Sequence, residues 1–202
     1  HGRELYIMYD ISGQSASTLY ETITTDSLNM SSSIVALWGF GFNENQCTPE
    51  VDKRVISYFK SKGCTVVGGV PAYYQTLSND CKPDKGWREV FNMLDVISPW
   101  TVGRYVDESS FDEYRKNVAL PNMVAALWKK QAYLPVVFPG YEFPNKPSVS
   151  RNGGKFFAHQ LQDVSSAYVA MFDEVDEATA VYKTLEYSDQ YLKIIANKKA
   201  PV

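Results

Sequence analysis

Histidine is scarce in this chain, which has only two, His1 and His159. They form no pair at the spacing of metal ligands, so no metal site is expected. The sequence also lacks a Gly-x-Ser-x-Gly elbow and a glycine-rich phosphate loop that opens a helix, which argues against serine-nucleophile and nucleotide chemistry. His159 stands in a helical pattern and is expected to be structural. No cofactor is therefore expected.

Long apolar runs and clustered cations are missing as well. No run of about 18 or more apolar residues occurs, so no insertion into a membrane is expected. The net charge is −3 and the lysines and arginines form no basic stripe, which argues against a nucleic-acid partner. No linker or low-complexity tract divides the chain, so residues 1–202 are expected to form a single domain.

Cysteine is rare too, and the three present suggest different roles. Cys64 heads an apolar run and is expected to be a buried thiol. Cys47 and Cys81 each lie in a polar loop beyond a strand-like segment, and a disulfide between them is reasonable if the two loops are neighbours. That disulfide would point to secretion, as does Asn29, which begins a possible N-glycosylation sequon. The protein is therefore expected to be secreted or extracellular.

Apolar segments recur about every thirty to thirty-five residues, which is the spacing of a βα unit. Several are continuous apolar runs, as expected of parallel strands covered on both faces. The expected strands are Leu5–Tyr9, Ile34–Phe40, Thr65–Val70, Val96–Trp100, Tyr133–Phe138 and Tyr168–Phe172. The fold class is therefore expected to be α/β.

Helical patterns fill the intervals between these strands. The clearest has Thr48 as its N-cap, Pro49 at the first helical position and Gly63 at its C-terminal end. A second is expected over residues 110–130, broken near Pro121, and a third over residues 154–164.

The residues that follow the C-terminal end of each strand include aromatic residues, glycine, proline or charged residues. The residues at the N-terminal ends of the strands show no such enrichment. A parallel (β/α)8 barrel concentrates its site at the C-terminal ends of its strands in this way. Aromatic planes beside carboxylates suit a sugar, whose ring has apolar faces and whose hydroxyls need polar partners. Trp38 and Trp100 fit either this role or core packing, while Trp87 and Trp128, on helical segments, are expected to pack in the core or on the surface.

A dense acidic cluster follows the last expected strand. The apolar run Ala167–Phe172 leads directly into Asp173, Glu174, Asp176 and Glu177. A solvated acidic loop is one interpretation. The other is a catalytic pair, because crowded carboxylates push each other's pKa values apart and can then serve as acid and base at one pH.

This cluster resembles a family motif. Residues 172–178, FDEVDEA, are similar to the Asn/Asp-Glu-x-x-Glu-Gly segment that ends the last barrel strand of endo-α-mannosidase-like glycoside hydrolases, families 99 and 71/99-like. Further segments resemble bacterial and fungal members that are sometimes labelled xylosidase/arabinosidase. These segments are Met8–Gly13, Val35–Phe42, Asp95–Tyr105, Pro135–Gly140 and Arg151–Gly154.

The resemblance implies a (β/α)8 barrel, of which the chain covers about the last six βα units, and a retaining glycosidase that acts on an α-linked, mannan-like glycan. By position, Glu174 would be the base that activates the sugar's own 2-hydroxyl to form a 1,2-anhydro sugar, and Glu177 the general acid/base. A scheme with a covalent intermediate on a protein nucleophile is the alternative. A non-catalytic, lectin-like protein on the same barrel, or a structural role, also stays open.

The resemblance also implies substrate contacts from Trp100, Tyr141 and Arg151. The strand endings and the acidic cluster add the other expected sugar contacts, which are Asp10, Trp38, Tyr73, Arg104, Asp173 and Asp176. An oligo- or polysaccharide is thus the expected partner.

The sequence departs from the family pattern at two points. Ala178 stands where the motif often has glycine. Two N-terminal strands of the barrel are missing, and because the fold usually takes about 250 residues, we expect a fragment or a chain assembled from pieces. A complete chain of this length would leave strand edges open for another chain to cover.

Overall fold

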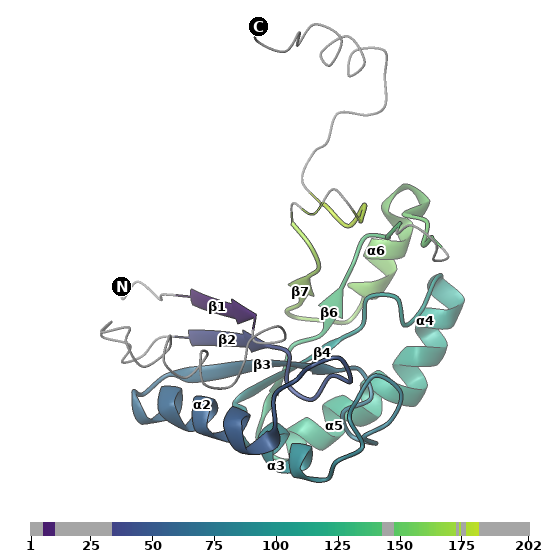
Figure 1. Cartoon of the computed structure of the whole chain (residues 1–202). Coiled ribbons are helices and arrows are strands. Elements are labelled where there is room, and N and C mark those ends of the chain that lie inside the picture. Colours follow the sequence, from purple (N-terminus) through teal and green to yellow (C-terminus); the bar gives the residue numbers. More distant parts are fainter. Residues whose placement is uncertain (1–5, 11–33, 143–147, 173, 175–176, 182–202) are drawn as a thin grey trace, which may run out of the picture.

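The computed structural model describes residues 6–10, 34–142, 148–172, 174 and 177–181. In this part of the chain, strands and helices alternate, which confirms the α/β class (Figure 1). The strands are β1 (Tyr6–Asp10), β2 (Ile34–Trp38), β3 (Thr65–Pro71), β4 (Val96–Trp100), β5 (Ala132–Tyr133), β6 (Val136–Val137) and β7 (Tyr168–Val169). The helices are α2 (Pro49–Ser61), α3 (Gly86–Met93), α4 (Glu108–Tyr114), the π-helix η1 (Arg115–Ala119), α5 (Leu120–Trp128), the 3-10 helix η2 (Asn152–Gly154) and α6 (Lys155–Gln160).

All strand pairs are parallel. The first five strands form one sheet in the order β1-β2-β3-β4-β5, and β6 pairs with β7. The strand expected over Tyr133–Phe138 is thus split into β5 and β6. Side chains bridge the split, because the Ser98 hydroxyl donates to the Leu134 carbonyl at 2.9 Å and the Thr101 hydroxyl to the Val136 carbonyl at 2.7 Å. Spatial order therefore follows chain order, as in a βα series, although no closed barrel is formed within the described residues.

Helix α2 forms as the sequence predicts. Thr48 is the N-cap residue, Pro49 opens the helix, and Gly63 follows it with a φ of 82°. The positive φ explains the glycine, because a Cβ would make this left-handed conformation costly.

The second expected helix is continuous at Pro121, which corrects the predicted break. Its first turn is capped by Asp107, whose carboxylate accepts from the Ser110 backbone N–H at 2.8 Å. The π-helical turn η1 then widens the helix just before α5, and Pro121 lies in the first turn of α5. Because proline has no N–H to donate to the preceding turn, the wider turn absorbs the missing hydrogen bond.

The third expected helix is shorter than predicted. It comprises η2 and α6 and ends at Gln160, not at residue 164. Beyond it, Asp163 has a φ of 62°, outside the helical region. His159 Nε2 lies 2.8 Å from Asp112 Oδ1 and links α6 to α4, in keeping with a structural role.

Two hydrophobic cores lie against the sheet. The first fills the space between the sheet and α2, α3 and α5, which share one face of the sheet (Figure 1), and contains the fully buried Phe40, Phe59 and Trp87. The expectation that Trp87 packs in the core is thus confirmed. The second core lies around β6, β7, α4 and α6 and centres on Phe138 and Phe156.

The predicted Cys47–Cys81 disulfide is absent, and all three cysteines are buried thiols. The two loops are neighbours, because Phe42 pairs with Cys81 and the Lys82 ammonium donates to the Cys47 carbonyl at 3.3 Å. The thiols nevertheless have different surroundings. Cys47 faces Asp52 of α2, whereas Cys81 lies near Asp80 and Arg88.

Burial raises the pKa of the Cys47 thiol to about 11 and that of the Cys81 thiol to about 12. Both thiols therefore stay protonated and unreactive at neutral pH. Secretion stays a prediction, because Asn29 lies outside the described residues. Among the helices that the structure describes, none has the length and apolar character needed to span a membrane.

Candidate functional site

The C-terminal ends of the parallel strands lie at one edge of the sheet. Trp38 is the last residue of β2 and Trp100 the last of β4, while Tyr73 follows β3. Asp10 ends β1 in register with Trp38. The expected sugar contacts from four strands are thus brought to the same edge, which is the position of sites in parallel α/β folds.

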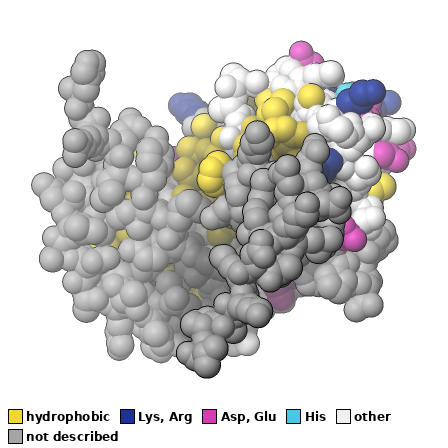
Figure 2. Space-filling view, turned by 90° about the horizontal axis from the view of Figure 1, so that it is seen from above, with side chains coloured by type: hydrophobic (Ala, Val, Ile, Leu, Met, Phe, Trp, Pro, Cys, Tyr) yellow, Lys and Arg dark blue, Asp and Glu magenta, His cyan; other side chains and the backbone are white. Residues whose placement is uncertain are grey.

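An aromatic cluster, formed by Trp38, Trp100 and Tyr168, lies near this edge. The ring centroid of Tyr168 is 4.7 Å from that of Trp38 and 6.5 Å from that of Trp100, and both pairs are tilted. All three side chains are half-buried, so part of each ring faces solvent. Hydrophobic side chains also gather on the face opposite α2 and α3, which is seen from above in Figure 2. The cluster has the apolar planes that a sugar ring could stack against.

Gly69 makes room for the Trp38 ring. A Cβ on Gly69 would overlap the indole atoms Cδ1, Cδ2 and Cε2. The neighbouring Gly68 faces the other side of β3, where a Cβ would overlap the Leu94 side chain. Strand β3 thus has one glycine under the aromatic cluster and one under the helical layer, because successive residues of a strand point to opposite faces.

Glu174 lies five residues beyond β7 and is held by hydrogen bonds from Thr179 and Ala180. The Thr179 hydroxyl donates to Glu174 Oε2 at 3.1 Å, and the Ala180 N–H donates to the Glu174 carbonyl at 3.0 Å. Burial raises the pKa of Tyr168, and the negative charge of Glu174 raises it further, so this carboxylate acts electrostatically on one ring of the aromatic cluster. Glu174 is exposed to solvent. Glu174 is therefore an accessible carboxylate that is held by hydrogen bonds and acts electrostatically on Tyr168.

Glu177 is anchored through its backbone. Its carbonyl accepts from the Glu142 N–H at 2.7 Å, which ties the acidic loop to the segment that follows β6, and Glu177 is half-buried. Asp173 and Asp176, the other two carboxylates of the cluster, lie outside the described residues.

Arg151 braces this loop. Its guanidinium donates from Nη2 to the Ala178 carbonyl at 2.8 Å and also to the Ala180 carbonyl. These hydrogen bonds fix the residues just after Glu177. A contact between Arg151 and substrate stays a prediction, because the described contacts are all with the loop.

Arg104 is likewise held by the protein. Its Nε and Nη2 donate to Asp80 Oδ2 at 3.0 and 2.8 Å. Asp80 also accepts from the backbone N–H groups of Ala72 and Tyr73, at 2.9 and 3.2 Å. Asp80 thus joins the loop after β3 to the loop after β4, and Arg104 is part of that joint.

The two remaining residues that were predicted to contact the sugar are Tyr73 and Tyr141. The Tyr73 ring packs edge-on against Tyr114 at 6.4 Å. Tyr141 pairs with Val149 through two backbone hydrogen bonds, of 3.0 and 2.7 Å, and its ring lies beside Gly103. Both rings are half-buried, and both pack against the second core.

Three residues that position the site were missed by sequence reasoning: Asp80, Tyr168 and Thr179. Tyr168 opens the last strand, where its apolar neighbours predict burial and give no sign of a role at the site. Thr179 lies two residues after the acidic cluster. A hydroxyl so near in the sequence is the one signal that could have indicated a hydrogen-bond donor to Glu174.

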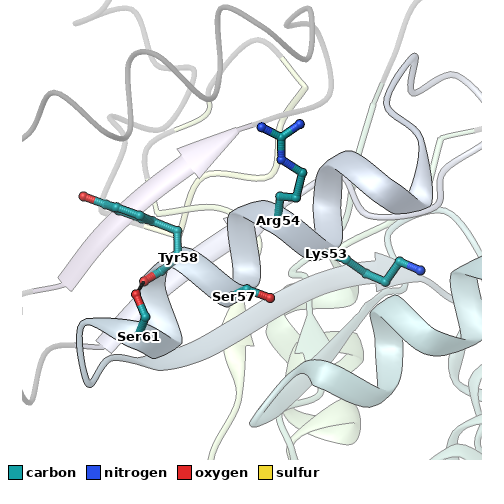
Figure 3. A pocket seen from close by; sticks show the side chains of 5 residues that line it. All are labelled: Lys53, Arg54, Ser57, Tyr58 and Ser61. Carbon is teal, nitrogen blue, oxygen red and sulfur yellow. Dashed lines mark hydrogen bonds between the residues drawn. The ribbon is translucent and has the colours of Figure 1, made fainter.

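A shallow hollow on α2 carries no comparable chemistry. It is lined only by residues of that helix, which are Lys53, Arg54, Ser57, Tyr58 and Ser61 (Figure 3). Lys53 extends toward α3 and pairs with Glu89 at 2.8 Å, and the Ser61 hydroxyl donates to the Tyr58 carbonyl. Among the described residues no group of three or more histidine, cysteine, aspartate or glutamate side chains could hold a metal ion.

No known protein family matches the chain. No curated protein and no solved structure is significantly similar to it either. The resemblance to glycoside hydrolase family 99 therefore stays a prediction, which rests on the motifs alone.

Proposed function

We propose that this chain is a glycoside hydrolase that acts on an α-linked glycan, with Glu174 and Glu177 as its catalytic carboxylates. The observation that carries the proposal is the state of Glu174, which is exposed, accepts a hydrogen bond from Thr179 and raises the pKa of Tyr168 in the aromatic cluster by its charge. Glycoside cleavage uses a pair of carboxylates, and aromatic rings near them can bind the apolar face of the sugar.

We also propose that the sheet belongs to a (β/α)8 barrel. Its support is the contact between Tyr168 of β7 and Trp38 of β2, which belong to separate sheets, because strands on opposite sides of a barrel would face each other in this way. The site would then lie at the C-terminal mouth of that barrel.

In the proposed reaction the sugar ring stacks on the aromatic cluster. Glu174 removes the proton of the sugar 2-hydroxyl, whose oxygen attacks the anomeric carbon, while Glu177 protonates the leaving glycosidic oxygen. Water then opens the 1,2-anhydro ring, with Glu177 taking the proton of the water and Glu174 returning the proton to O2. If Glu174 instead attacked the anomeric carbon itself, a covalent glycosyl-enzyme would form.

A lectin-like function is the second candidate. It is favoured because both arginines that were predicted to contact the sugar bind the protein itself. Arg104 pairs with Asp80, and Arg151 donates to two backbone carbonyls. Stacking on aromatic rings alone is sufficient for sugar binding and does not require turnover.

The test is hydrolysis of α-linked manno-oligosaccharides, measured beside their binding by calorimetry, for the unaltered chain and for E174Q and E177Q. Each substitution should lower kcat by about a hundredfold or more and leave binding within a few fold. E113Q, at an exposed glutamate of α4, is the matched control and should leave both unchanged.

Unchanged hydrolysis in E174Q and E177Q would contradict the assigned roles. Binding without any hydrolysis by the unaltered chain would favour the lectin. Absence of both binding and hydrolysis across α-linked glycans would contradict the two candidates together.

A further inference from the structure

A cavity of about 180 Å³ lies where the chain changes its strand partner, and residues of β5, β6, α4, η1 and α5 line it. The Leu134 N–H donates to the Ile97 carbonyl of β4 at 2.9 Å. The carbonyl of the next residue, Pro135, instead accepts from the Tyr168 N–H of β7 at 2.8 Å. Because proline has no N–H to continue the ladder, the sheet divides at Pro135, which is itself part of the lining.

The lining of this cavity is rich in aromatic rings. Four of its residues are Tyr105, Phe111, Tyr114 and Tyr133. The ring centroid of Tyr105 lies 5.0 Å from that of Phe111 and 5.2 Å from that of Tyr114, so these rings hold each other in place. Aromatic walls of this kind attract the faces and edges of a further ring.

Three polar side chains of the lining use their hydrogen-bond donors within the protein. The Tyr105 hydroxyl donates to Gln160 Oε1 at 2.9 Å, and the Thr101 hydroxyl donates to the Val136 carbonyl at 2.7 Å. The Gln160 amide donates in turn to two backbone carbonyls, at 2.7 and 3.1 Å. This part of the lining therefore has no donor left for a ligand.

Tyr114 differs from these three side chains. It lines the cavity and is only 6% exposed, yet its hydroxyl makes no hydrogen bond with any residue that the structure describes. Burial raises the pKa of Tyr114, and Tyr133 raises it further, so the hydroxyl keeps its proton at neutral pH. A buried donor without an acceptor destabilises the fold. An acceptor atom held in the cavity would remove that cost.

The helix that carries Tyr114 changes its geometry at the cavity. Tyr114 ends α4, and the first and last residues of the π-helical turn η1, Arg115 and Ala119, also line the cavity. Turns of this kind are frequent at functional sites. Arg115 pairs at 3.2 Å with Asp163, another lining residue, whose side chain is 80% exposed. The cavity therefore reaches the surface beside this ion pair.

We propose that the cavity binds a small, uncharged, single-ring aromatic compound of the phenol class, whose oxygen accepts from the Tyr114 hydroxyl. A cavity of about 150 Å³ is sufficient for benzene, so this one has room for a ring with one substituent. A neutral ligand is favoured because the two charged residues of the lining, Arg115 and Asp163, pair with each other. None of the residues proposed to contact the sugar lines the cavity, so this proposal is independent of the proposed hydrolysis.

Calorimetric titration of the whole chain with phenol and with toluene tests the proposal. The two compounds have the same number of heavy atoms, but toluene has no oxygen acceptor. We expect phenol to bind with a Kd of about 1 mM or lower. Y114F should weaken phenol binding by about tenfold and leave toluene binding within about twofold, because only phenol loses a hydrogen bond. The matched control Y58F, on α2, should leave both affinities unchanged.

Methionine methyl signals in NMR spectra test where the ligand binds. Met123 of α5 lines the cavity, whereas Met93 of α3 does not. Phenol should therefore shift the Met123 methyl signal and leave that of Met93 in place. A119F, which puts a ring into the cavity, should abolish the binding of both compounds, and circular dichroism confirms that each variant is folded.

Each of three results would overturn the proposal. The first is no binding of phenol up to about 10 mM. The second is a Y114F variant that binds phenol as well as the unaltered chain does, or that loses affinity equally for phenol and toluene. The third is a Met123 signal that stays in place when phenol is bound.

Discussion

The ring of Trp38, at the end of β2, lies 4.7 Å from the ring of Tyr168, at the start of β7. The two strands belong to different sheets and lie far apart in the chain. Their contact joins the end of a strand in the five-stranded sheet to the start of a strand in the two-stranded sheet. Glu174 follows β7 in the chain, and its negative charge raises the pKa of Tyr168, so this contact also links the candidate carboxylate to the aromatic cluster.

Substitution of Gly69 should disturb the aromatic cluster. G69A puts a methyl group into the space of the Trp38 indole, so the ring has to shift. We expect a fall in stability of about 1–3 kcal/mol and at least a tenfold loss of glycan affinity. Calorimetric binding and chemical denaturation measure the two effects.

The matched control for this prediction is G68A. Its methyl group meets Leu94 on the helical side of the same strand. It should lower stability by a similar amount and leave glycan affinity unchanged. Equal losses of affinity in both variants would mean that the cluster has no specific role.

Removal of the charge of Asp80 should loosen the joint between the loops after β3 and β4. D80N abolishes the charged acceptor of Arg104 and should cost about 1–3 kcal/mol of stability. D163N, which breaks the exposed pair with Arg115, should cost less than about 1 kcal/mol. Denaturant unfolding measures the free energy of unfolding of both variants. Equal losses would show that the Arg104–Asp80 pair stabilises the fold no more than the exposed Arg115–Asp163 pair does.

Loss of the Thr179 hydroxyl should impair the proposed catalysis. T179V keeps the shape of the side chain but removes the donor to Glu174 Oε2, so the carboxylate is no longer fixed. We expect kcat to fall by about ten- to a hundredfold with little change in KM. T179S retains a hydroxyl and should restore most of the rate. If T179V and T179S behave alike, Thr179 does not position Glu174.

Asp52 should make stability depend on pH. It is fully buried in α2, and neither carboxylate oxygen accepts a hydrogen bond of normal geometry. Burial raises its pKa from 3.8 to about 7, against smaller lowering effects of the Cys47 thiol and the Lys82 ammonium. The folded state therefore holds the proton more tightly than the unfolded state.

The stability that this proton provides is present below about pH 4 and is lost as the pH rises to about 7, by up to about 4 kcal/mol. D52N, which cannot ionise, should remove this dependence and be the more stable protein at pH 8. Thermal melts from pH 4 to 8 measure it. A wild-type profile with the same slope as that of D52N would contradict the prediction.

Local patterns of the sequence determined the secondary structure well. Each of the six apolar runs contains a strand, although the fifth is split into β5 and β6 and the sixth is shortened to Tyr168–Val169. Thr48, Pro49 and Gly63 predicted α2, because caps and left-handed turns depend on neighbours in the chain. The same patterns failed at Pro121, where the helix absorbs the proline with a π turn that has no simple sequence signal.

The sequence also indicated that Trp38, Trp100 and the acidic cluster lie at strand ends. Only the tertiary structure decided what each residue there contacts. In the structure Arg104 pairs with Asp80, and Arg151 donates to the loop carbonyls. Tyr168 and Thr179 belong to the candidate site. Cys47 and Cys81 lie on neighbouring loops without forming a disulfide. These contacts join residues that are far apart in the sequence. They depend on how the strands and loops pack together, which no local sequence pattern indicates.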